Sequence, residues 1–119
     1  MNENYELILV IISRGYSDVV MEAARRAGAT GGTVVNARGL GSKTVEKFFG
    51  ITIQPEKELV YILAPERIKA DIMREVCKDV GLNTAGKGIA FSLKVDDVLG
   101  VVKESSIDKG VNDEVERDS

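Results

Sequence analysis

The segment YELILVIIS, residues 5–13, carries six consecutive apolar residues from Leu7 to Ile12. Four of these six side chains are β-branched, and β-branched residues favour strands. The run is far shorter than the ~18 residues of a membrane-spanning helix, so it predicts a strand inside a folded domain. Because successive side chains of a strand point to opposite sides of a sheet, this strand is apolar on both faces.

Five further elements are predicted along the rest of the chain. They are a helix from residue 17 or 18 to Gly28, a strand at 32–38, a strand at 59–64, a helix from Pro65 to Gly81 and a strand at 89–95. The second helix carries apolar residues at a spacing of four, and glycine commonly follows the last turn of a helix. The order of elements is therefore βαββαβ.

This order is typical of the ferredoxin-like fold, an α+β sandwich in which two helices cover one face of a four-stranded antiparallel sheet. Right-handed crossovers place the strands at 5–13 and 59–64 in the middle of that sheet, and these two strands are apolar throughout. Either the odd-numbered or the even-numbered residues of 7–12 then face away from the helices. Such a patch is too large for a soluble monomer, so we expect assembly through the open face.

Composition narrows the functional classes. The chain has 119 residues, a net charge of −3, no histidine and one cysteine, Cys77. The length fits one domain, and the acidic surplus in 104–119 predicts a flexible tail after a folded domain at 1–103. We expect a cytoplasmic protein, not embedded in a membrane, without a metal site and without a clustered basic face for nucleic acid. Cys77 lies on the apolar stripe of the second helix and is predicted to be a small core residue.

The connection at 39–56 is longer than most loops between strands. It contains Phe48 and Phe49 beside charged residues. Two interpretations stay open: a β-hairpin whose apolar residues pack locally, or a flexible loop that presents the aromatic pair to a partner and orders on contact.

Two glycine-bearing segments resemble parts of the P-II nitrogen regulatory proteins. Residues 27–34 (AGATGGTV) with 38–41 (RGLG) resemble the second strand and the T-loop entry of that family, and residues 85–91 (AGKGIAF) resemble its B-loop. The resemblance covers about residues 5–102. It implies a T-loop at about 39–57, a B-loop at about 83–89 and a homotrimer whose sheets pack inward.

The resemblance also implies a ligand site between subunits, where glycines let the backbone approach phosphates. The positions that correspond to that cleft, or lie near it with a positive charge, are Thr33, Arg38, Gly39, Gly41, Lys43, Gly86, Lys87 and Gly88. An adenine nucleotide (AMP, ADP, ATP or cyclic AMP) or another small anionic metabolite is the expected effector. The chain departs from the family in its charges: Lys87 replaces the B-loop acid, Lys43 replaces a glutamine, and Gly100 and Val102 replace two arginines.

The leading hypothesis is a regulatory trimer that binds such an effector, with nitrogen or carbon metabolism as the candidate setting. It controls a target protein, a transporter or an enzyme, through residues 42–57, in which Phe48 and Phe49 bind the partner. The alternative is a structural or adaptor trimer that has lost nucleotide binding. Catalysis is not expected, because Glu46, Glu56 and Glu58 have no visible acid or base partner. The ferredoxin-like divalent-cation-tolerance trimers share the architecture but lack these glycine turns.

Overall fold

The computed structural model describes residues 3–39, 46–48, 51–53, 56–82 and 88–100. Eight elements follow one another: β1 (Tyr5–Ser13), α1 (Ser17–Arg26), β2 (Thr33–Arg38), β3 (Glu46–Phe48), β4 (Ile51–Ile53), β5 (Glu56–Pro65), α2 (Glu66–Val80) and β6 (Gly88–Val95). The predicted tail at 104–119 and the boundary at 103 lie outside the described residues. No helix in the described part of the chain is long and apolar enough to cross a membrane.

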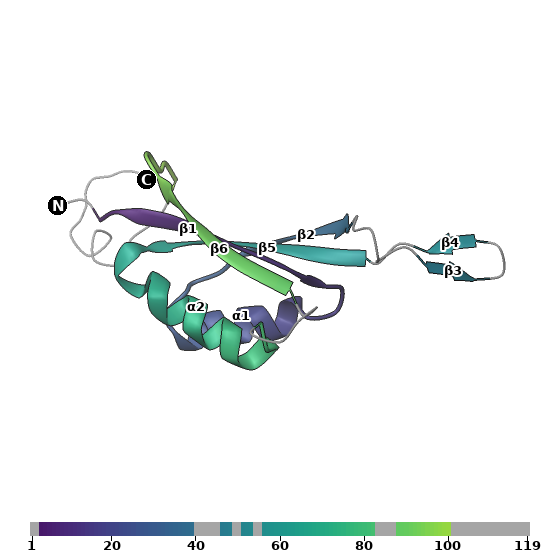
Figure 1. Cartoon of the computed structure of the whole chain (residues 1–119). Helices are drawn as coiled ribbons and strands as arrows, with labels where there is room; N and C mark the ends of the chain where they lie inside the picture. Colours follow the sequence, from purple (N-terminus) through teal and green to yellow (C-terminus); the bar gives the residue numbers. More distant parts are fainter. Residues whose placement is uncertain (1–2, 40–45, 49–50, 54–55, 83–87, 101–119) are drawn as a thin grey trace.

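Four strands form an antiparallel sheet in the order β2-β5-β1-β6, and both helices lie on one face of it (Figure 1). The ferredoxin-like fold is confirmed, with β1 and β5 as its central strands. β5 begins at Glu56, three residues before the predicted start, because Lys57 pairs with Ser13 of β1 while Glu58 pairs with Asn36 of β2. Neighbours on both sides satisfy the backbone of these polar residues, so the strand extends beyond its apolar segment.

The core lies between the helices and the sheet face beneath them. Ile8, Val10 and Ile12 of β1 are fully buried, which settles the open alternative: the even-numbered residues face the helices. The core is completed by residues from the other central strand and from both helices, namely Val60, Ile62, Ala64, Val20, Met21, Ala23, Ala24, Ile72, Val76 and Val80. Cys77 is half-buried and does not belong to this cluster, so its prediction as a core residue was wrong.

The opposite face of the sheet is apolar as well, and no helix of the described residues covers it. Its side chains form three rows across the strands: Ile89–Ile11–Leu59–Val35, Phe91–Leu9–Tyr61–Thr33 and Leu93–Leu7–Leu63. We call these residues the open face. Ile89 and Leu93 are 55% and 53% exposed, while the residues of β1 in these rows are half-buried by their neighbours within the sheet.

The long connection after β2 contains a hairpin in which β3 pairs antiparallel with β4 (Figure 1). Phe48 pairs with Ile51 through the backbone, and the hairpin projects beyond the end of the four-stranded sheet. The hairpin interpretation is therefore confirmed for the backbone of 46–48 and 51–53. Phe49 lies outside the described residues.

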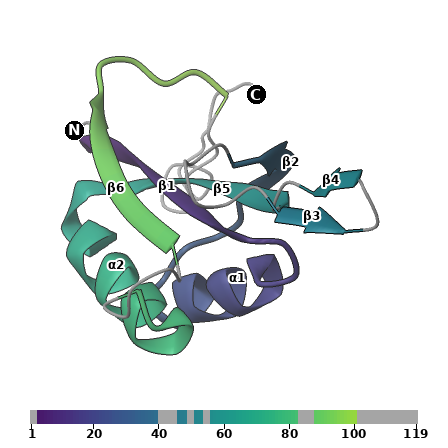
Figure 2. The same cartoon turned by 45° about the vertical axis from the view of Figure 1, so that its right-hand side comes forward.

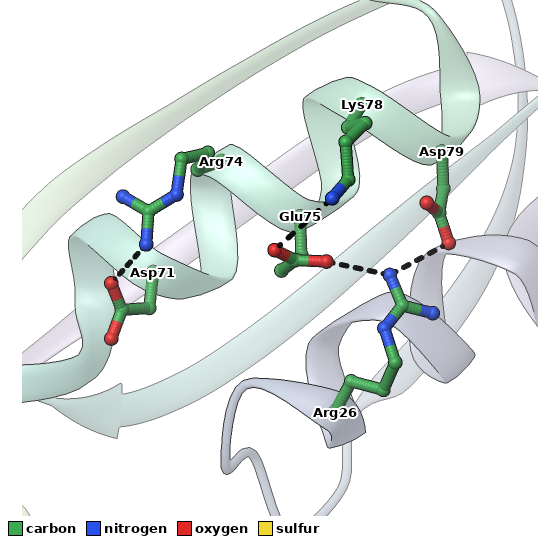
Figure 3. A network of polar contacts seen from close by, with 6 residues as sticks. All are labelled: Arg26, Asp71, Arg74, Glu75, Lys78 and Asp79. Carbon is green, nitrogen blue, oxygen red and sulfur yellow. Dashed lines mark hydrogen bonds and ion pairs between the residues drawn. The ribbon is translucent and has the colours of Figure 1, made fainter.

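An ionic contact joins the two helices on their outer side (Figure 3). Arg26 Nη2, at the end of α1, lies 2.7 Å from Glu75 Oε1 and 3.0 Å from Asp79 Oδ2, one turn apart on α2. The hydrogen bond with Glu75 is the largest cause of the raised pKa of Arg26 and, in turn, of the lowered pKa of Glu75. This pair of contacts ties the helices to each other above the core.

Candidate functional site

The two glycine-bearing segments reach the same end of the sheet but opposite edges. Gly39 follows β2 directly, and Gly88 is the first residue of β6. A row of paired residues runs from Gly88 through Ile12 and Glu58 to Asn36, so three strand spacings, about 14 Å, separate the two edges. Within one chain the described residues Gly39 and Gly88 therefore lie apart, at opposite edges of the sheet.

Gly88 is required by packing. Its φ is +145°, and a Cβ atom there would lie 2.5 Å from the carbonyl oxygen of Ile11 and 3.0 Å from Ile12 Cγ2. Backbone atoms cannot move aside as the end of a flexible side chain can, so only glycine fits where β6 begins to pair with β1. Packing alone therefore explains why position 88 is glycine, without any ligand.

Gly39 lies under a cation that sequence reasoning did not single out. A Cβ atom at Gly39 would lie 2.9 Å from Lys57 Cε, so the side-chain stem of Lys57 covers this glycine. Lys57 is half-buried and pairs with Ala37 across the β2–β5 ladder. The missed signal was the true start of β5, because only a strand that includes residue 57 places this lysine beside the end of β2.

Thr33 and Arg38 do not converge in one chain. Thr33 pairs with Tyr61 on the open face, whereas Arg38 pairs with Glu56 and alternates with Val34 on the other face. The two residues are also five positions apart, about 17 Å along an extended strand. Arg38 is exposed and forms no ion pair within the described residues.

Glu56 and Glu58 both have structural partners that the sequence did not reveal. The carboxylate of Glu56 pairs with the guanidinium of Arg14. Glu58 Oε1 accepts hydrogen bonds from the backbone N–H groups of Gly15 and Ser17, each at 3.1 Å. Both carboxylates are thus used to hold the connection between β1 and α1.

The remaining predicted site residues, Gly41, Lys43, Phe49, Gly86 and Lys87, lie outside the described residues. Among the residues that are described, no three His, Cys, Asp or Glu side chains gather as metal ligands do.

The N-terminal end of β1 holds the one buried charged side chain in the described set, Glu6, which is 4% exposed. Lys94 Nζ lies 3.5 Å and Lys69 Nζ 3.6 Å from its carboxylate oxygens. The neighbouring carboxylates of Glu66 and Glu6 raise the pKa of Lys94, so this far end is a structural ion cluster.

Comparisons with known proteins agree with this fold. Residues 5–105 match the family model described as nitrogen regulatory protein P-II. Among solved structures, the chain is similar to GlnK of B. subtilis in complex with ATP, with a TM-score of 0.61 and 14% identity, over 80% of this chain and 84% of that one. A search of curated proteins gives no match.

Proposed function

Because the chain belongs to the P-II family of nitrogen regulatory proteins, we propose that it is a regulatory protein whose ligand site forms between the subunits of a homotrimer. The ligand is a small anionic metabolite or an adenine nucleotide. The segment at 39–57, with Phe48 and Phe49, is the part that contacts a target protein. The target is a transporter or an enzyme, in nitrogen or carbon metabolism.

The observation that carries this proposal is the placement of the two glycine segments at opposite edges of one sheet end. A site that uses both needs two chains. The open face supplies the reason for assembly, because its apolar rows would be removed from water when three sheets pack against one another.

The cationic residues support an anionic ligand. Arg38 is exposed at the end of β2, and the side chain of Lys57 covers Gly39. In the sequence, Lys43 lies four positions after Gly39, and Lys87 directly precedes Gly88. With Thr33, Gly41, Gly86 and Gly88 they form the proposed site. The similar GlnK structure is a complex with ATP, which supports an adenine nucleotide as the first ligand to test. We further propose a non-catalytic, cytoplasmic protein without nucleic-acid ligands, with the folded domain at 1–103.

Calorimetric titration of the trimer with AMP, ADP, ATP and cyclic AMP, with and without magnesium, tests the site. We expect weak binding that depends little on magnesium, because Lys43 stands where the family has a glutamine. Lys87→Ala should weaken binding about tenfold or more, since a charge-assisted hydrogen bond contributes roughly 1.5–3 kcal/mol. The exposed Lys78 on α2 provides the matched control, and Lys78→Ala should bind like wild type. Tight, magnesium-dependent ATP binding would contradict the proposal that the substituted residues weaken nucleotide affinity and remove its dependence on magnesium.

An adaptor trimer without a ligand is the second candidate. It is favoured by Gly88, because packing alone explains why this position is glycine. It is also favoured by Gly100 and Val102, which stand where the family has two arginines. An intact trimer that binds no phosphate ligand at millimolar concentration, yet still captures its target through 39–57, would support this candidate.

A further inference from the structure

The connection between β1 and α1, residues 14–17, is held by the first residues of β5. The backbone N–H of Arg14 donates to the carbonyl oxygen of Glu56 at 3.1 Å, and the Arg14 guanidinium pairs with the Glu56 carboxylate. Two residues later, Glu58 Oε1 accepts the N–H groups of Gly15 and Ser17. Both views show this connection beside the start of β5 (Figures 1 and 2).

Glu58 does for α1 what a capping residue normally does. The N-cap position is Tyr16, which makes no side-chain capping bond, so the first N–H groups of the helix need another acceptor. A carboxylate is favourable there because the amino end of a helix carries a partial positive charge. Gly15 has a φ of +100°, a conformation that suits glycine and leaves its N–H directed at the same oxygen. The cap therefore comes from a residue 41 positions further along the chain.

The same short stretch of β5 is also the root of the hairpin. We define the root as the pair Arg38 and Glu56, the last pair of the β2–β5 ladder before the segment at 39–55. Glu56 belongs to the root and to the contacts with Arg14, and Glu58 is two residues beyond it. Any change in the path of β5 at the root thus acts directly on the acceptors that hold residues 14–17.

We propose that Glu58 is a positioning residue that couples the connection at 14–17 to the root of the hairpin, so that the two segments become ordered together. A partner or ligand that fixes the root then also fixes the start of α1, and a partner bound at the start of α1 acts back on the root. The regulatory meaning of this coupling rests on the proposed function of 39–57, whereas the coupling itself is a property of one chain.

Amide hydrogen exchange on the full-length protein without ligand tests the coupling. In Glu58→Ala, we expect exchange at least tenfold faster at Gly15 and Ser17, and a matching acceleration at Ala37 and Lys57, which pair with each other across the β2–β5 ladder. Glu58→Gln should restore much of the protection, because its amide oxygen can accept the same N–H group, although without the charge. Glu22→Ala is the matched control, since Glu22 is an exposed acid of α1 outside these contacts.

Two outcomes would overturn the proposal. Faster exchange at Gly15 and Ser17 with unchanged exchange at Ala37 and Lys57 would make Glu58 a helix cap and nothing more. Unchanged exchange at all of these amides would remove even the cap. Should Glu58→Ala not fold, Glu58→Gln and Arg14→Ala carry the same test, with Arg14→Ala expected to raise exchange at the root and at residues 14–17 by a smaller factor. Because no nucleotide is present, a failed titration and a failed coupling are distinguishable results.

Discussion

The two faces of the sheet have similar apolar composition and opposite surroundings. On β1, Ile8, Val10 and Ile12 are fully buried under the helices, while the residues between them lie on the open face and remain half-exposed. At the edge strand β6, Ile89 and Leu93 of the open face are more than half exposed. A row of apolar side chains therefore indicates a face that needs to be shielded from water. Whether the helices of the same chain shield it depends on the strand register and on the position of the helices.

The largest effect is expected on the covered face. Val10→Asp would place a carboxylate in the buried core, and burying an unpaired charge costs several kcal/mol, comparable with the whole stability of a domain of this size. We expect an unfolded chain without a cooperative urea transition, measured by far-UV circular dichroism. A folded variant with a normal transition would contradict the assignment of this face.

The neighbouring residue on the open face should respond differently. Leu9→Asp adds the same charge where no helix lies, so the isolated chain can keep it hydrated, but three packed sheets cannot. We expect retained secondary structure and a monomer in sedimentation equilibrium, against a trimer for wild type. Leu9→Met, which nearly conserves volume, should remain a trimer. A stable monomer of the wild-type protein at micromolar concentration would refute assembly through the open face.

A smaller effect is expected where β6 enters the sheet. Gly88→Ala forces a Cβ atom to within 2.5 Å of the Ile11 carbonyl oxygen and requires a positive φ at alanine, which should lower the free energy of unfolding by roughly 1–3 kcal/mol. Gly31→Ala is the matched control, because no atom lies within 4 Å of the added methyl group. Urea midpoints of the two variants give the comparison, and equal midpoints would show that β6 shifts without cost.

Much of the fold could be predicted from the sequence because its signals are local. Alternation and helical spacing gave the six main elements, and the apolar runs identified the two central strands. The features that depend on contacts between distant parts of the chain could not be predicted from the sequence. Which parity of β1 faces the helices depends on how the helices return to the sheet, and the partners of Glu58 are 41 and 43 positions away. The candidate site was predictable only in its residue types, since Gly39 and Gly88 lie at opposite edges of the sheet and the proposed site needs a second chain.

The smallest effect concerns the helix layer that makes the covered face possible. Arg26→Ala removes the contacts with Glu75 and Asp79 at the surface, where water still reaches all three side chains, so we expect only a slight fall of the urea midpoint at neutral pH. The pH dependence is more informative. Arg26 lowers the pKa of Glu75 below its ordinary value of 4.5, so this contact stabilises the folded chain above that pH and the contribution is lost as the pH falls through the lowered pKa. The difference between wild type and Arg26→Ala should therefore be present at neutral pH and disappear in acid well below 4.5, and added salt should also reduce it.

Arg25→Ala is the matched control, because Arg25 is exposed beside Arg26 and forms no ion pair in the described residues. It should show no such pH-dependent difference. A difference for Arg26→Ala that stays constant from neutral to acidic pH would mean that the side chain acts through packing of its aliphatic stem and not through its charge.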